Sequence, residues 1–80
     1  MKILFHGRLA ELIAPELALP AQGGCSVAEL RQRLASDYPQ AGETLANLRS
    51  RAVVGTAVVG EDHRVGSGDR LEFLSPVSGG

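Results

Sequence analysis

The chain has 80 residues, 44% of them apolar, and a formal net charge of −1 at pH 7. This length predicts a single domain over residues 1–80, with a small core and a stability that is marginal enough to make partner binding plausible. The balanced charge excludes the basic stripe of a nucleic-acid-binding protein, and no apolar run approaches membrane-spanning length.

Cysteine usage and the first residues predict where the protein works. Cys25 is the single cysteine and therefore cannot form an internal disulfide. A strand-like segment follows Met1-Lys2 directly, which leaves no room for the apolar region of a signal peptide. We therefore expect a soluble cytoplasmic protein. The local basic pair Arg49 and Arg51 is expected to lie at a solvated helix end.

Two strands with a short helix between them are predicted in the first 20 residues. In residues 2–6, alternation places Ile3 and Phe5 on one face of a strand. The other face of that strand carries Lys2, Leu4 and His6. Residues 8–14 have helical spacing and end at Pro15, and residues 16–20 alternate again, so they predict a strand that returns beside the first.

The stretch CSVAELRQRLASDYP predicts the main helix. Ser26 and Glu29 have the spacing of a capping box, with Ser26 as the N-cap. Cys25 and Leu30 have the spacing of a hydrophobic staple, and Pro39 ends the helix. The apolar side chains at intervals of three or four are Val27, Leu30, Leu34 and Tyr38.

The second half of the chain predicts mostly strands. Residues 41–50 indicate a short helical turn or an irregular link anchored by Leu45 and Leu48. Residues 52–59 predict two short strands around a tight turn at Gly55-Thr56, and residues 60–69 are rich in turn residues. In a last strand over residues 70–74, Leu71 and Phe73 point inward while Arg70, Glu72 and Leu74 point outward. One helix across a mixed sheet of four to five strands is an α+β arrangement.

The side chains offer no catalytic constellation. One Cys and two distant His cannot supply the three or four ligands of a zinc site, so we expect no metal. The segment VGSGDR lacks the lysine and the helix of a phosphate loop and is turn chemistry. Cys25 is interpreted as a staple residue, with a reactive thiol at a helix N-terminus as the alternative. His63 is interpreted as a solvated loop residue and His6 as an outer-face strand residue.

The C-terminus is the unusual feature. Gly79 and Gly80 follow the predicted last strand within a few residues, and neither has a Cβ. Such a tail, from about residue 75, is flexible, narrow and sterically open around its carboxylate, so it could enter a confined site. A frayed terminus would be the alternative explanation.

The ending GDRLEFLSPVSGG resembles the C-terminus of the small subunit of molybdopterin synthase, a ubiquitin-like sulfur carrier family with the β-grasp fold. The shared pattern is a Gly-Asp turn at Gly68-Asp69, a strand, Pro-Val, Ser and Gly-Gly. The opening KILFHGRLAELIA resembles the first strand and short helix of that family, and SVAELRQRLA resembles its main helix. The resemblance is weakest in residues 40–51. The chain departs from the family at Leu74-Ser75, where a second aromatic and a second proline are common.

The resemblance implies a chemistry for the tail. In the family an activating enzyme uses ATP to adenylate the terminal glycine, here Gly80, and a sulfur donor converts the acyl-adenylate to a thiocarboxylate. The tail then enters the large subunit, where its sulfur attacks the cyclic pterin precursor. Threading would involve Pro76, Val77, Ser78 and Gly79. The carrier itself would be no enzyme on its own and would bind no cofactor or metal.

The resemblance also implies partners and a docking surface. The partners are the large synthase subunit, in an assembly of two small and two large subunits, the activating enzyme and a sulfur donor protein, with no nucleic acid or membrane. In the β-grasp family the first and last strands lie side by side. Leu4, His6 and Leu74 would then form an exposed patch at the tail exit, joined by Val58 if Ala57 faces the core.

Three alternatives stay open. A related carrier for thiazole synthesis also ends in Gly-Gly on this fold. A ubiquitin-like modifier would attach Gly80 to lysines of other proteins. In a non-covalent interaction module the tail would be incidental.

Overall fold

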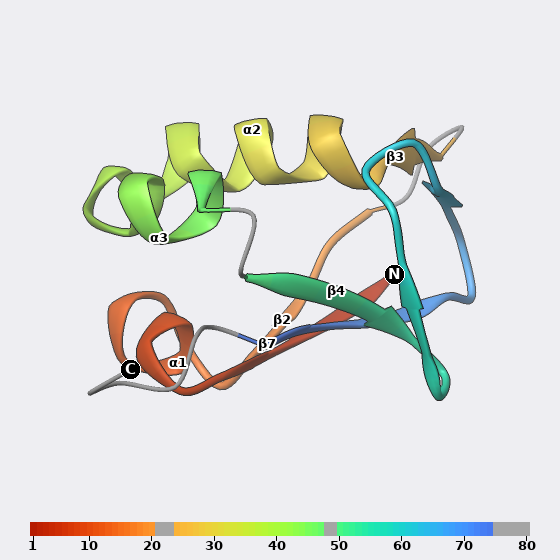
Figure 1. The fold of residues 1–80 in the computed structure, drawn as a ribbon, viewed down its shortest axis with the longest axis horizontal. Helices are drawn as coiled ribbons and strands as arrows, with labels where there is room; N and C mark the ends of the chain where they lie inside the picture. The colour runs from red at the N-terminus through yellow and green to blue at the C-terminus, as the bar shows by residue number, and fades with distance from the viewer. Residues whose placement is uncertain (21–23, 48–49, 75–80) are drawn as a thin grey trace.

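The computed structural model describes residues 1–20, 24–47 and 50–74. Within these ranges the chain forms a five-stranded sheet in the order β2-β1-β7-β4-β5 and a separate pair of short strands, β3 and β6 (Figure 1). The sheet strands are β1 (Lys2–His6), β2 (Glu16–Ala18), β4 (Arg51–Val54), β5 (Ala57–Val59) and β7 (Arg70–Leu74). Strands β1 and β7 pair in parallel, whereas the other neighbours in the sheet are antiparallel.

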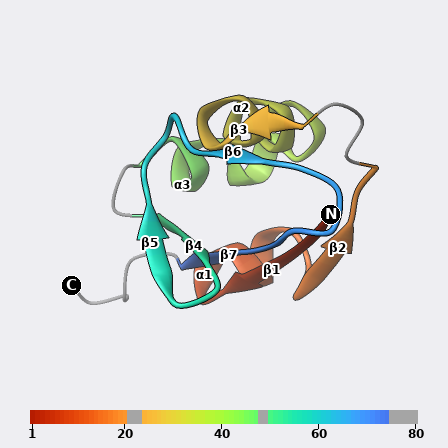
Figure 2. The same cartoon turned by 90° about the vertical axis from the view of Figure 1, so that its right-hand side faces the viewer.

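Helices cover one face of this sheet. The main helix is α2 (Val27–Asp37), followed by the 3-10 turn η1 (Pro39–Ala41) and the short helix α3 (Gly42–Ala46). Figure 2 shows α2 and α3 together on one side of the sheet, with β3 (Cys25–Ser26) and β6 (Arg64–Val65) beside the start of α2. Helix α1 (Arg8–Leu12) follows β1 directly. We call the sheet face that α2 and α3 leave uncovered the outer face.

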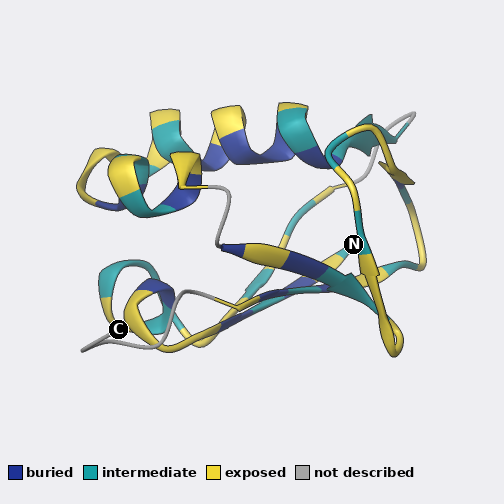
Figure 3. Ribbon diagram, in the orientation of Figure 1, coloured by how far each residue is buried: buried dark blue, intermediate teal, exposed yellow. Residues whose placement is uncertain are grey.

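The core lies between the sheet and α2, as predicted. Ile3, Phe5, Leu71 and Phe73 are buried, and the intervening residues of both strands are more exposed (Figure 3). The rings of Phe5 and Phe73 stack with centroids 6.0 Å apart and planes at 11°. From α2 the core receives Val27, Leu30 and Leu34, with Tyr38 partly buried beside them. The predicted strand parity and helix stripe are therefore confirmed.

The predicted elements form in the described residues, but α1 and β2 end earlier than expected, at Leu12 and Ala18. Leu45 is buried in α3 as expected, whereas Leu48 lies outside the described residues. The turn-rich segment contains β6, which pairs with β3 through Cys25↔Val65 and Ser26↔Arg64. Gly24, just before β3, has φ +74°, and a Cβ there would lie 2.9 Å from the carbonyl oxygen of Val65. The expectation that Arg51 lies at a helix end is wrong, because Arg51 begins β4.

The capping box at the start of α2 is confirmed. The Ser26 hydroxyl accepts the Glu29 N–H at 3.1 Å, and the Glu29 carboxylate accepts the Ser26 N–H at 2.9 Å. The Ser26 backbone hydrogen bond, then the Ser26 side chain and more weakly Arg64, hold the pKa of Glu29 below its usual 4.5. Because this pKa is lowered on folding, ionised Glu29 stabilises the fold above about pH 4.5.

This stabilisation by Glu29 is expected to be lost as the pH falls below about 4.5 through the folded-state pKa. Glu29→Gln keeps an acceptor at the same place but cannot ionise, so it should melt below the parent protein at pH 7. Thermal melts between pH 7 and pH 3 should show the two melting temperatures converging. A difference that stays constant across this range would contradict the role of the charge.

Candidate functional site

The predicted reacting group lies beyond the described part of the chain. Strand β7 ends at Leu74, and Pro76, Val77, Ser78, Gly79 and Gly80 all follow it in the sequence outside the described residues. Their roles therefore stay predictions. What the structure describes is the position from which this tail continues, at the end of a strand that lies in the middle of the sheet.

Strand register brings three outer-face side chains together at that position. Leu74 pairs with His6 across β1 and with Arg51 across β4. Leu74 is 40% exposed, and His6 and Arg51 are exposed as well. The row His6–Leu74–Arg51 therefore crosses the three central strands immediately before residue 75.

A second row lies beside the first on the outer face. Glu72 pairs with Leu4 across β1 and with Val53 across β4, and Val53 pairs in turn with Val58 on the edge strand β5. Val58 is 62% exposed. The register thus groups the four predicted patch residues Leu4, His6, Val58 and Leu74 on one face. By register Ala57 lies on the core side of β5, opposite Val54, although it is itself exposed.

A polar pair in this surface was not predicted from the sequence. His6 Nε2 lies 2.8 Å from Glu72 Oε1, and both side chains are partly exposed. The pair joins β1 and β7 diagonally, because Glu72 is opposite Leu4 and His6 is opposite Leu74. Strand parity placed both residues on the outer face, but only the parallel register of β1 and β7 brings them into contact. The predicted apolar patch therefore contains a charged group at its centre.

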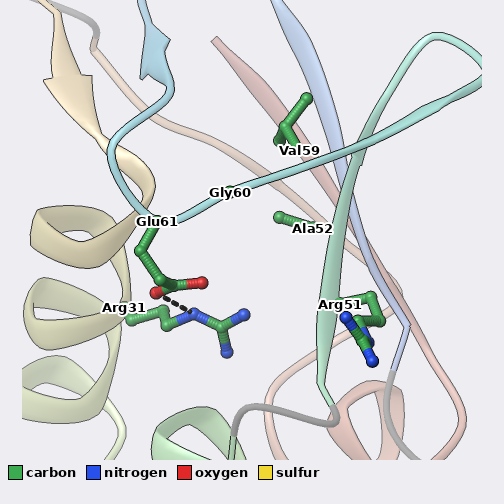
Figure 4. A pocket seen from close by; sticks show the side chains of 6 residues that line it. All are labelled: Arg31, Arg51, Ala52, Val59, Gly60 and Glu61. Atoms are coloured by element: carbon green, nitrogen blue, oxygen red, sulfur yellow. Dashed lines mark ion pairs between the residues drawn. The ribbon is translucent and has the colours of Figure 1, made fainter.

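A pocket of about 210 Å³ lies near the edge of the sheet, lined by Arg31, Arg51, Ala52, Val59, Gly60 and Glu61 (Figure 4). Arg31 is buried, and its guanidinium donates to the carbonyl oxygens of Leu45 and Ser50. Its Nε lies 2.8 Å from Glu61 Oε1 in an ion pair, and its Cζ lies 5.2 Å from the centroid of the Phe73 ring. Through these contacts the guanidinium joins α2 to α3, to Ser50 just before β4 and to the loop after β5, so its role is structural.

The N-terminus of α2 also has structural partners. Beyond the capping box, Val27 N–H donates to the His63 carbonyl at 3.0 Å and Ala28 N–H donates to the Glu61 carbonyl at 2.9 Å. The first backbone donors of the helix are therefore occupied by the loop after β5. Cys25 is half-buried and packs against the core, as expected for a staple residue, and the His63 side chain is exposed.

The described residues contain neither a cluster of metal ligands nor a membrane-spanning helix. Among them, no three His, Cys, Asp or Glu side chains gather closely enough to hold a metal ion. In the same residues no helix has both the length and the apolar character needed to cross a membrane.

The mixed sheet packed on one main helix, with the first and last strands parallel at its centre, defines a ubiquitin-like β-grasp protein. A sequence profile described as the ThiS family matches residues 3–80, and the chain belongs to this family. It is 30% identical over 80 residues to the molybdopterin synthase sulfur carrier subunit of Escherichia coli strain K12, covering 100% of this chain and 99% of the relative.

Two solved structures show the same fold. The crystal structure of SAMP1 from Haloferax volcanii has a TM-score of 0.80 at 17% identity and covers 99% of this chain and 97% of its own. A crystal structure of the H. volcanii small archaeal modifier protein 1 has a TM-score of 0.77 at 14% identity and covers 95% of each chain. The predicted β-grasp fold is confirmed by these structures, and the predicted family relationship by the sequence matches.

Proposed function

We propose that this protein is a sulfur carrier for molybdopterin biosynthesis, whose reacting group is the carboxylate of Gly80. The observation that carries the proposal is the end-to-end similarity to the E. coli sulfur carrier subunit of molybdopterin synthase. The sequence Ser78-Gly79-Gly80, six residues or fewer after β7, supports it, since the chemistry needs an unhindered carboxylate on a narrow segment.

The chemistry requires activation by a partner. A carboxylate is a poor electrophile, because oxide is not a leaving group. Attack of the Gly80 carboxylate on the α-phosphate of ATP gives an acyl-adenylate and releases pyrophosphate. The terminal sulfur of a persulfide donor then attacks the acyl carbon and expels AMP, which gives an acyl disulfide. A thiol attacks the donor-side sulfur of this bond, so that a thiocarboxylate is released on Gly80 and a disulfide forms with the donor. ATP binds the activating enzyme and not the carrier.

The tail residues have separate roles in this proposal. Gly80 carries the thiocarboxylate, and Gly79 provides clearance in a channel that has no space for a Cβ. Pro76, Val77 and Ser78 span the distance between the end of β7 and the reacting group. Because no side chain of this chain takes part in bond making, the protein is a carrier and not an enzyme on its own.

The partners follow from the same proposal. The thiocarboxylate is consumed in the large subunit of molybdopterin synthase, in an assembly of two small and two large subunits. The pterin precursor takes up two sulfur atoms, so two loaded carriers are used in turn. The activating enzyme and the sulfur donor protein are further partners.

Intact mass spectrometry tests the proposal directly. After incubation with the activating enzyme, ATP and a sulfur source, the carrier is expected to gain the mass difference between one sulfur and one oxygen. Fragmentation should place this change on Gly80. A sulfur located on Cys25 as a persulfide would contradict the thiocarboxylate mechanism.

A protein-modifier function is the second candidate, because the fold neighbours from H. volcanii are named as small archaeal modifier proteins. A modifier would form an isopeptide bond between Gly80 and a lysine of another protein. A search for such linkages by mass spectrometry of cell extracts distinguishes the two functions.

A third candidate, the thiazole carrier, is tested by supplying thiazole or molybdopterin to a strain that lacks the gene and recording which one restores growth.

The outer face provides a binding prediction. Leu74→Glu is expected to weaken binding to the large subunit by about tenfold or more, because it places a charge in an apolar contact next to the tail. The melting temperature should change little, since Leu74 is 40% exposed. Calorimetric titration of the large subunit with each variant measures the effect.

Gln32→Glu is the matched control for this experiment, because it adds the same charge at an exposed position of α2, away from the outer face. Its affinity should stay within about twofold of the parent. Equal affinities for Leu74→Glu and Gln32→Glu would show that the outer face is not the docking surface.

A further inference from the structure

The residue row before the tail contains one cation that has no ion pair with another described residue. Across this row Leu74 lies between His6 and Arg51 (residues paired in the β1–β7 and β7–β4 registers). His6 contacts the Glu72 carboxylate at 2.8 Å. Arg51 is exposed and has neither an ion pair nor a side-chain hydrogen bond to any described residue.

The structure also explains why Glu72 does not pair with Arg51. Both residues lie on the outer face, and Glu72 is diagonal to Arg51 across β4 just as it is diagonal to His6 across β1. The Glu72 carboxylate is directed from β7 toward β1, where His6 binds it. On the other side, Figure 4 shows the Arg51 guanidinium apart from the Arg31–Glu61 ion pair. The carboxylates of Glu72 and Glu61 are therefore each engaged by another base and not by Arg51.

Apart from Glu72, which binds His6, the neighbours of Arg51 on this face are apolar. Leu74 lies on one side of it, and Val53 and Val58 form the adjacent part of the second row. A partner that covers Leu74 and Val58 also covers Arg51, and desolvating a guanidinium is costly unless a carboxylate replaces its water. Arginine is well suited to such a place, because its planar group binds a carboxylate through two parallel hydrogen bonds.

We propose that Arg51 selects the partner that receives the tail, by pairing with a carboxylate that lies beside an apolar pocket for Leu74 on the large synthase subunit. This inference rests on the proposed function. The Arg51 ion pair fixes which protein can dock and in which orientation, while the contact of Leu74 supplies apolar burial. A partner with a lysine or an arginine at that position is rejected by repulsion.

The test is calorimetric titration of the large subunit from the same organism with carrier variants at low and high salt. The affinity of Arg51→Glu should be at least about tenfold lower than that of the parent. The affinity of Arg51→Gln should lie between these two. Arg51→Lys should bind more tightly than Arg51→Gln, because it keeps the charge. It should bind more weakly than the parent, because it loses the paired hydrogen bonds. The affinity of the parent should fall more steeply with salt than that of Arg51→Gln.

Arg70→Glu is the matched control. Arg70 is exposed on the outer face of β7 and also has no ion pair with a described residue, but four residues, roughly 13 Å, separate it from Leu74. Its affinity should stay within about twofold of the parent. Thermal melts of all variants should coincide, since both arginines are exposed.

Charge reversal on the partner completes the test. Exposed carboxylates of the large subunit are changed to lysine one at a time, and one such change should restore the binding of Arg51→Glu. Suppose that the parent gains sulfur on Gly80 and binds the large subunit. Equal affinities for Arg51→Glu and Arg70→Glu would then overturn the role of Arg51 but leave the proposed sulfur-carrier function standing. A parent that neither gains sulfur nor binds overturns the proposed function together with the role of Arg51.

Discussion

Deletion of Gly80, or addition of one residue after it, is expected to abolish sulfur transfer and leave the melting temperature unchanged. The proposed reaction uses the carboxylate of Gly80 and no side chain, so moving that group by one residue removes it from the reacting position. Terminal residues carry little folding stability. Gly79→Val should have the same effect, because a branched Cβ crowds a narrow channel and restricts the backbone. The measurements are molybdopterin formation in a reconstituted assay and thermal melting.

Two substitutions serve as controls for the tail variants. Cys25→Ser and His63→Ala should keep full activity, since Cys25 packs against the core and the His63 side chain is exposed. If Cys25→Ser abolished activity and the Gly80 deletion did not, the reacting group would be the thiol. The protein would then be a persulfide carrier.

Phe73→Ala is expected to destabilise the fold by about 3–5 kcal/mol, the usual cost of removing a large core side chain. Phe73 is fully buried, stacks on Phe5 and contacts the guanidinium of Arg31. Since a domain of this size has a stability of only about 5 kcal/mol or little more, the variant should retain about 2 kcal/mol or less, and its urea midpoint should move close to zero denaturant. Urea titration followed by circular dichroism measures the change.

Leu74→Ala is the matched control, because it truncates the next residue of the same strand on the opposite face. Its cost should be about 1 kcal/mol or less, as for most substitutions at exposed positions. A cooperative melt of Phe73→Ala close to the temperature of the parent would show that the two faces of β7 had been assigned the wrong way round.

Much of the fold could be predicted because the signals are local. Alternation in residues 2–6 and 70–74 identified the buried face of both central strands, and the capping box identified the first residue of α2. By contrast, the pairing of β3 with β6 has no local signal. Each strand has two residues, and their contact depends on how the loop after β5 folds back over the start of α2.

Arg31 illustrates the same limit within the core. A charged residue on α2 is expected at the surface, yet Arg31 is buried because acceptors from three other segments converge on it: the carbonyls of Leu45 and Ser50 and the carboxylate of Glu61. None of these acceptors is close to Arg31 in sequence. Only the tertiary arrangement of α3, the residue before β4 and the loop after β5 accounts for its burial.

The candidate site divides in a similar way. The tail and the outer-face residues Leu4, His6, Val58 and Leu74 follow from sequence order and strand parity. The contact of His6 with Glu72, and the lack of an ion pair between Arg51 and any described residue, depend on register across three strands. Parity alone does not determine that register.

The parallel pairing of β1 and β7 has a consequence for synthesis on the ribosome. Strand β7 is the central strand of the sheet, and without it β1–β2 and β4–β5 are two separate hairpins. Isolated hairpins of this length are marginally stable in water. The nascent chain therefore exposes the apolar sides of both hairpins until residues 70–74 leave the exit tunnel and join them. Folding of this domain consequently waits for its last strand, and until then the apolar side chains of both hairpins are accessible to chaperones.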